Sequence, residues 1–87
     1  MRSLDIPAPV AEVIAELRAL DGLTLRGKTL SALYLKNKPF LHFHWNSEEI
    51  VADVRYAGAT FVRVPVNTPA ERRQLVANVR AFVAERT

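Results

Sequence analysis

The stretch Phe40-Leu41-His42-Phe43-His44-Trp45 decides the fold, because histidines alternate there with large apolar side chains. A period of two is the pattern of a β-strand, whose successive side chains point to opposite faces of a sheet. His42 and His44 therefore share one face, and the apolar residues beside them share the other. The apolar face predicts one side of a hydrophobic core, and the pair of histidines is a candidate site.

Segments of the same character flank this strand on both sides. Four strands are predicted, at residues 29–36, 39–45, 50–56 and 60–66, and residues 23–26 favour a shorter fifth strand. The spacers between the four strands contain two to four residues, among them Asn37, Ser47 and Gly58. Spacers this short join antiparallel neighbours but cannot hold the crossover that parallel strands need. We therefore predict a four- or five-stranded antiparallel meander.

An amphipathic helix is predicted at each end of the meander. Pro7 and Pro9 suit the first turn of the first helix. The second helix begins at Thr68-Pro69-Ala70-Glu71, a capping box in which the first and last residues satisfy each other's backbone N–H groups. Apolar residues recur at helical spacing in both helices: Val10, Val13, Ile14, Leu17 and Leu20 in the first, and Leu75, Val76, Val79, Phe82 and Val83 in the second. Both stripes should cover the same sheet face, so we predict a single α+β domain over residues 1–87, a two-layer sandwich.

The expected register assigns each strand residue to one face of the sheet. Turns at residues 37–38, 47–48 and 57–59 keep the apolar sets of neighbouring strands together. The core side then carries Leu30, Ala32, Tyr34, Leu41, Phe43, Trp45, Ile50, Ala52, Val54, Val62, Val64 and Val66. The opposite face carries the candidate site residues Leu33, Leu35, Phe40, His42, His44, Asp53, Arg55, Phe61 and Arg63, together with Thr29, Ser31 and Val51. On that face Ser31 should lie across from His44, and Asp53 between His42 and Arg63.

The opposite face is unusually apolar for a surface in contact with water. Five of its side chains are large and apolar: Leu33, Leu35, Phe40, Val51 and Phe61. A solvated sheet face normally alternates into Thr, Lys, Glu and Ser, and soluble monomers rarely expose so large a patch. We therefore predict that this face is covered, and that the protein is a non-enzymatic module that binds a second copy of itself, as a homo-oligomer, or a partner.

The two histidines allow a second interpretation of the same face. Our first expectation is that they hydrogen-bond to Ser31 and Asp53 within an interface. The alternative is a metal site in which His42 and His44 chelate Zn²⁺ or another transition metal and Asp53 is the third ligand. No other cofactor is expected.

Two further interpretations of the face are weaker. A hydrolytic set of Ser31, one of the histidines and Asp53 would need a nucleophile elbow and a glycine-rich oxyanion hole, and the sequence has neither. A small aromatic ligand could bind near the rim of the face, beside Tyr34, Trp45 or Phe61, although aromatic residues at such positions are more often part of an ordinary core.

The formal net charge of +3 is distributed in blocks of alternating sign. Residues 1–22 and 41–54 carry net charges of −2 and −3, whereas residues 26–38 and 55–87 each carry +4. Blocks of opposite sign within a small domain favour contacts with one another or with a second copy of the chain. The chain also lacks a basic run interleaved with aromatic residues, so we do not predict nucleic-acid binding.

The cellular environment is constrained only by what the sequence lacks. It contains no cysteine, which excludes disulfides, thiolate nucleophiles and cysteine metal clusters. Its first seven residues include no apolar signal segment, and no run approaches the roughly 20 apolar residues of a membrane span. We therefore expect a cytoplasmic protein that does not associate with membranes.

The segment from Lys36 to His44, followed by residues 50–55, resembles a small family whose members are labelled luciferase-domain proteins. That family shows a strand ending in a His-x-His-like element, an Ala-Asp or Asp-Leu strand, and a strand that leads through a Ser/Thr-x-x-Glu box into a terminal helix. The resemblance covers residues 22–86, although the chain lacks the extra segment that those proteins usually carry between the last two strands. It implies the α+β topology but no light-producing chemistry, and it points to no site residues beyond His42, His44 and Asp53.

Overall fold

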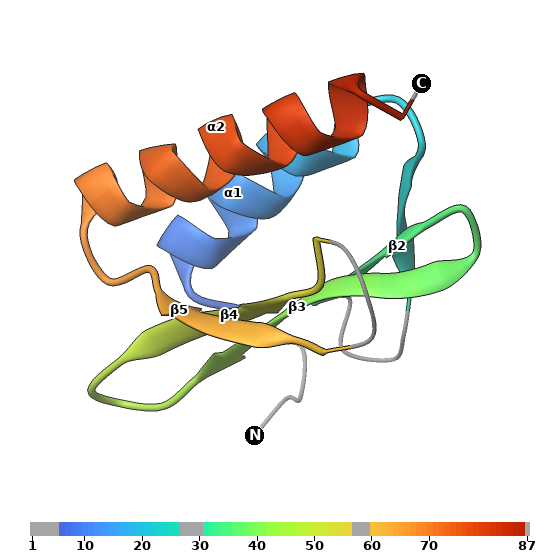
Figure 1. Ribbon diagram of the computed structural model, residues 1–87. Coiled ribbons are helices and arrows are strands. Elements are labelled where there is room, and N and C mark those ends of the chain that lie inside the picture. Colours follow the sequence, from blue (N-terminus) through green and yellow to red (C-terminus); the bar gives the residue numbers. More distant parts are fainter. Residues whose placement is uncertain (1–5, 27–30, 57–59, 87) are drawn as a thin grey trace.

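The computed structural model describes residues 6–26, 31–56 and 60–86 and consists of two helices and five strands. The strands form one antiparallel sheet in chain order, β1-β2-β3-β4-β5. Both helices lie on one face of this sheet (Figure 1), which confirms the two-layer α+β sandwich. The elements are α1 (Ala8–Arg18), β1 (Leu23–Arg26), β2 (Ala32–Leu35), β3 (Lys38–Trp45), β4 (Ile50–Val54), β5 (Val62–Pro65) and α2 (Pro69–Ala84).

The start of α2 is held by the predicted capping box. The Thr68 hydroxyl accepts a hydrogen bond from the Glu71 N–H at 3.1 Å, and the Glu71 carboxylate accepts one from the Thr68 N–H at 3.0 Å. Asn67 extends this arrangement, because its side-chain oxygen accepts a hydrogen bond from the backbone N–H of Ile50 at 2.6 Å. The helix cap is therefore attached directly to the first residue of β4.

The hydrophobic core lies between the helices and the sheet. The predicted helix stripes supply eight of its buried residues: Val10, Val13, Ile14 and Leu17 from α1, and Leu75, Val76, Val79 and Val83 from α2. Leu20 and Phe82, the remaining members of the two stripes, are partly buried against the same cluster. The helical periodicity was therefore a reliable guide to which residues fill the core.

The central part of the sheet has the predicted register. In the β3–β4 ladder Leu41 lies opposite Val54 and Phe43 lies opposite Ala52, all four of them buried. The β4–β5 ladder continues this alignment. The histidines of β3 consequently point to the face that the helices leave uncovered.

The register between β2 and β3 differs from the prediction in two ways: the turn is one residue earlier than the predicted 37–38, and β3 has a β-bulge at Phe40. The hairpin turns at Lys36 and Asn37, whose φ angles of 53° and 68° are those of a two-residue turn with both central residues left-handed. Tyr34 lies opposite Pro39, but Leu33 lies opposite Leu41, so Phe40 is the extra residue on β3. A shift of one residue moves side chains to the other face of the sheet.

Because of the bulge, three candidate site residues lie on the other face of the sheet from the one predicted. Leu33 and Phe40 were predicted on the face opposite the helices, but they are 0% and 3% exposed within the core, and Leu35 is packed against the same core. Of the five apolar residues expected on the opposite face, only Val51 and Phe61 are not part of this core. Tyr34 was predicted on the core side but lies on the face opposite the helices. It is two residues from Ala32 along β2, and Ala32 lies opposite His42.

The outer strand β5 forms one edge of the sheet. Val62 was predicted in the core with Val64 and Val66, but it is 55% exposed because an edge strand has a neighbour on one side only. Val66 is buried, and its N–H donates to the Ile50 carbonyl in the neighbouring chain segment. Because N–H directions alternate along a strand, Pro65 occupies a position whose N–H would point away from the sheet.

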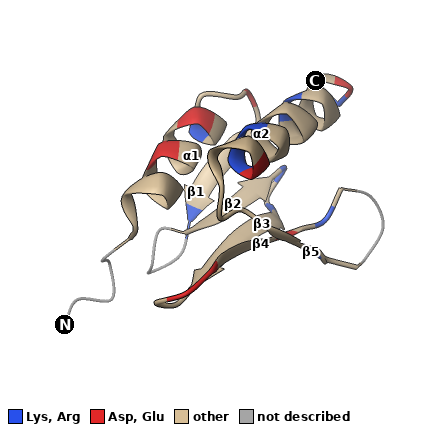
Figure 2. Cartoon of the chain, turned by 90° about the vertical axis from the view of Figure 1, so that its left-hand side faces the viewer, with Lys and Arg blue, Asp and Glu red and all other residues tan. Residues whose placement is uncertain are grey.

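Charged segments of both signs lie close together on the surface. Figure 2 shows acidic segments on α1 and at the hairpin between β3 and β4, and basic segments on α2. A shallow groove between the helices is lined by Glu12 and Glu16 of α1 and by Arg72 and Arg73 near the start of α2. Acidic and basic side chains of the two helices therefore border the same groove.

Two expectations fall outside the described residues: the core position of Leu30, and the turn at residues 57–59 through Gly58. Within the described ranges, neither helix is long and apolar enough to cross a membrane.

Candidate metal centre

Three neighbouring strands bring polar side chains together on the sheet face opposite the helices. His42 and His44 lie two residues apart on β3, so they share this face. Asp53 of β4 lies directly opposite His42, and Arg63 of β5 lies directly opposite Asp53. The predicted order of these residues across the sheet is confirmed, with the carboxylate between the histidines and the arginine.

The two histidines direct the same ring atom at the same carboxylate oxygen. The Nε2 atoms of His42 and His44 are each 3.3 Å from Oδ2 of Asp53, and one potential ligand atom from each residue lies within 4.8 Å of the other two. The imidazole rings are nearly perpendicular, at 87°, with centroids 4.7 Å apart. The three side chains therefore converge on one point above the sheet.

The spacing between these atoms is compatible with metal ligands. Ligands bonded to a tetrahedral Zn²⁺ at about 2.0 to 2.1 Å lie about 3.3 Å from one another. An N–H···O hydrogen bond most often has a donor–acceptor distance of about 2.9 to 3.0 Å. His42 and His44 are each separated from Asp53 by 3.3 Å, which equals the distance between two ligands of Zn²⁺.

Arg63 orients the carboxylate and keeps it ionised. Its Nε donates to Oδ1 of Asp53 at 2.9 Å, and its Nη2 donates to Oδ2 at 3.0 Å. These hydrogen bonds hold the pKa of the Asp53 carboxyl below its ordinary value of 3.8, against the opposing effect of partial burial, and the charge of Arg63 and the two histidines add to the lowering. Asp53 is therefore a fixed, deprotonated carboxylate at neutral pH.

Phe61 and Arg55 form one side of the cluster. The ring of Phe61 lies 5.1 Å from the ring of His42, and the Arg55 guanidinium lies 5.0 Å from the centre of the Phe61 ring. Arg55 also donates a hydrogen bond to the carbonyl of Pro39. The sequence placed Arg55, Phe61 and the histidines on one face, and these contacts bring them together there.

Beside the histidines the surface is hollowed. A shallow cavity of about 390 Å³ is lined by Ser31, Ala32, His42, Phe43, His44 and Trp45. The His44 side chain is 52% exposed and that of His42 is 32% exposed, so both ring edges are accessible from this side. A group bound between the histidines would therefore be open to solvent and to a small ligand.

The expected partnership of Ser31 with His44 is displaced by one residue. The Ser31 carbonyl accepts a hydrogen bond from the N–H of Phe43, so Ser31 is aligned with Phe43 instead of His44. The cause is the earlier hairpin turn together with the bulge at Phe40. Tyr34 also lies on the site face, where the Arg26 guanidinium is 5.1 Å from the centre of its ring. The sequence did not predict this position of Tyr34, because no residue pattern marks the bulge.

Comparisons with family models, with curated proteins and with solved structures found no match to this chain. The resemblance to luciferase-domain proteins therefore stays a prediction. The functional argument rests on the geometry of the cluster itself.

Proposed function

We propose that this chain binds a divalent transition metal, Zn²⁺ in the first instance, through His42, His44 and Asp53 on the sheet face opposite the helices. The observation that carries this proposal is the 3.3 Å separation of both Nε2 atoms from a single carboxylate oxygen. Neutral imidazole nitrogen and carboxylate oxygen are common ligands of Zn²⁺ in proteins. Three protein ligands leave the fourth position to water or to a small ligand.

Arg63 supports the metal site from outside the ligand set. Residues that hydrogen-bond to a ligating carboxylate fix its orientation and tune its affinity for the metal. Because the guanidinium also neutralises part of the Asp53 charge, it reduces the attraction for a cation. The combination favours an exchangeable metal ion over one that is permanently held to maintain the fold.

Calorimetric titration of Zn²⁺ into the metal-free protein tests this function. We expect one ion per chain with a dissociation constant below about 100 μM. His42→Ala and His44→Ala should each abolish binding, and Asp53→Asn should weaken it, because a site with fewer than three protein ligands holds Zn²⁺ poorly. Glu48→Gln, which removes an exposed carboxylate from the same hairpin, is the matched control and should leave binding unchanged.

Two results would contradict the proposal. One is binding weaker than the stated limit, and the other is binding that is indifferent to Asp53. A parallel titration with Co²⁺ adds a spectroscopic measurement, because four-coordinate Co²⁺ absorbs visible light far more strongly than the hydrated ion. The absorption should be lost in the two histidine variants.

A second candidate function uses the same face for self-association or for binding a partner. Val51 and Phe61 remain beside the cluster on this face. Analytical ultracentrifugation should then show an assembly that Phe61→Asp dissociates and that Arg73→Glu, on the surface of α2, leaves intact. A monomer at micromolar concentration would exclude the homo-oligomer. The oligomeric state and the cytoplasmic location expected from the sequence stay predictions.

A further inference from the structure

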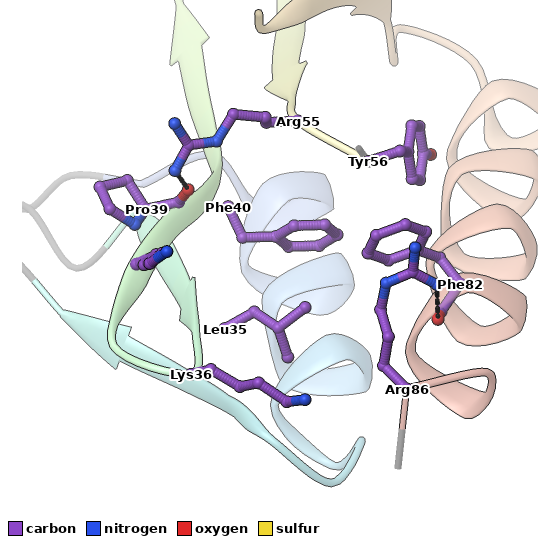
Figure 3. A pocket seen from close by; sticks show the side chains of 9 residues that line it. Leu35, Lys36, Pro39, Phe40, Arg55, Tyr56, Phe82 and Arg86 are labelled. Carbon is purple, nitrogen blue, oxygen red and sulfur yellow. Dashed lines mark hydrogen bonds between the residues drawn. The ribbon is translucent and has the colours of Figure 1, made fainter. Parts of the chain in front are cut away.

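A second cavity, distinct from the histidine cluster, opens between the β2–β3 hairpin and the C-terminal end of α2 (Figure 3). Its volume is about 400 Å³, within the range of pockets that hold small molecules. Neither histidine lines it. The pocket lies where the bulge at Phe40 turns that side chain toward α2, so one irregularity in β3 separates the two sites.

The base of this pocket is aromatic. The rings of Phe40 and Phe82 are stacked, with centroids 5.6 Å apart and an angle of 15° between their planes. Tyr56 meets both rings edge-on, at 6.2 Å from Phe40 and 5.4 Å from Phe82. Burial raises the pKa of Tyr56 above its ordinary value of 10.0, so its phenol stays neutral. Leu35 extends this apolar surface toward the hairpin turn, as Figure 3 shows.

The rim of the pocket is cationic. Lys36, Lys38, Arg55 and Arg86 all line it, and no acidic residue does so. Among the described residues no carboxylate forms an ion pair with either lysine. Arg86 lies over the Phe82 ring at 3.6 Å. It also forms an ion pair with Glu85 at 3.5 Å, and Glu85 lies outside the pocket lining. An apolar pocket with four positive charges at its mouth is complementary to an amphiphilic anion.

The cations at the two ends of the rim lie differently relative to the aromatic base, although Arg86, like Arg55, donates to a backbone carbonyl, that of Phe82 at 3.4 Å. Arg55 donates to the Pro39 carbonyl, which turns its guanidinium away from the aromatic base (Figure 3). At the other end the Lys36 side chain extends toward Arg86 beyond Leu35 in the same view. The left-handed backbone of Lys36 in the tight turn fixes the starting direction of that side chain. The geometry therefore favours an anion at the end formed by Lys36 and Arg86.

We propose that this pocket binds a small aromatic carboxylate, whose ring packs against Phe82 and Phe40 and whose carboxylate accepts hydrogen bonds from Lys36 and Arg86. The aromatic part matches the base because offset and edge-on ring contacts contribute binding free energy beyond that of removing apolar area from water. The carboxylate matches the rim because hydrogen bonds between charged partners are stronger than neutral ones. This binding activity is separate from the proposed metal site and does not depend on it.

Two probes that differ in charge alone test the pocket. 1-Naphthylacetate and its neutral amide, 1-naphthylacetamide, are titrated into the ¹⁵N-labelled protein and followed by NMR. We expect the carboxylate to bind at least about tenfold more tightly than the amide, because the amide cannot form the charged hydrogen bonds. The shifted resonances should belong to residues around Lys36, Phe40, Tyr56 and Phe82.

Charge variants identify the residues responsible. Lys36→Gln combined with Arg86→Gln should reduce the affinity for 1-naphthylacetate to about that of the amide. Arg80→Gln is the matched control, since it removes the same kind of charge from an exposed position on the same helix. Phe82→Leu should weaken both probes, because it removes the ring but keeps an apolar side chain.

Three outcomes would overturn the proposal. The carboxylate and the amide bind equally, the control Arg80→Gln weakens binding as much as the double variant, or the shifted resonances cluster around His42 and His44 instead. The charge variants should remain folded, since the substituted side chains are at the surface. The NMR spectrum of each variant shows directly whether it is folded. Because the titration contains no metal ion, a failure of the proposed metal site would not affect it.

Discussion

His42 lies directly opposite Asp53 in the β3–β4 ladder, and its Nε2 atom is 3.3 Å from the Oδ2 atom of the carboxylate. Side chains of directly opposed residues in an antiparallel pair are the closest cross-strand neighbours in a sheet. The pair is therefore held by the backbone itself, so its geometry does not depend on a loop. A ligand set placed on regular strands in this way is preorganised for a metal ion, because little conformational entropy is lost when the ion binds.

Zinc binding should weaken as the pH falls. Metal and proton compete for the Nε2 atoms of His42 and His44, since only the neutral imidazole binds a metal ion. The low pKa of Asp53 keeps the third ligand ionised over the same range. Calorimetry over a range of decreasing pH values should show a steadily decreasing affinity. An affinity that is constant over this range would mean that the histidines are not ligands.

Asp53 should stabilise the fold at neutral pH and lose this effect in acid. Its carboxyl pKa is below 3.8 in the folded protein because Arg63 hydrogen-bonds to the ionised form, so the unfolded chain takes up the proton at a higher pH. The stabilisation is thus fully present above the unfolded pKa and disappears as the pH falls through the folded pKa. Urea unfolding should show that Asp53→Asn lowers the free energy of unfolding at pH 7, and that this difference shrinks below about pH 4.

The control for this acid effect is Glu48→Gln, which removes a solvent-exposed carboxylate. Its difference from the unmodified protein should stay small at every pH, because an exposed group has a similar environment in the folded and unfolded chain. If Asp53→Asn and Glu48→Gln give the same pH profile, the ion pair with Arg63 contributes nothing to stability.

The faces of β2 can be tested by stability measurements on Leu33. Leu33 is fully buried, so Leu33→Ala should lower the free energy of unfolding by about 2 to 5 kcal/mol. Val62→Ala at the exposed edge should change it by less than about 0.5 kcal/mol. Both values come from denaturant unfolding followed by circular dichroism. A small loss at Leu33 would instead place this residue on the face opposite the helices, as the unbulged register predicts.

The capping box provides a test of the start of α2. Thr68→Ala removes the side-chain acceptor for the Glu71 N–H, so the free energy of unfolding should fall by about 0.5 to 2 kcal/mol. Ser47→Ala, in the hairpin between β3 and β4, should have a much smaller effect in the same assay. Equal losses in the two variants would show that the helix does not begin at Thr68.

The sequence was sufficient to predict the features that depend on local patterns. The capping box, the two helix stripes and the alternation through His42 and His44 each follow from residues that are close in the chain. The proximity of His42, His44 and Asp53 was predicted for the same reason, since a short hairpin aligns β3 with β4 and brings Asp53 opposite His42.

The features that the sequence could not predict depend on one backbone irregularity and on tertiary packing. Nothing in the alternation around Phe40 reveals that this residue is bulged, so Leu33 and Leu35 were assigned to the wrong face. The pocket beside Phe40 was missed because its walls come from a hairpin turn, the end of β4 and the end of α2. Their meeting depends on how the last helix crosses the sheet, which no local pattern specifies.

Pro65 bears on how copies of this chain can pack in concentrated solution. It lies in the edge strand β5 at a position whose N–H would point outward, and proline has no N–H to offer. A further strand that approached this edge would lack one of the hydrogen bonds it needs, so growth of a continuous intermolecular sheet is discouraged from this side. The opposite edge, at β1, has no proline and ends in Arg26. Among the residues of that strand, only the charge of Arg26 opposes pairing with a further strand.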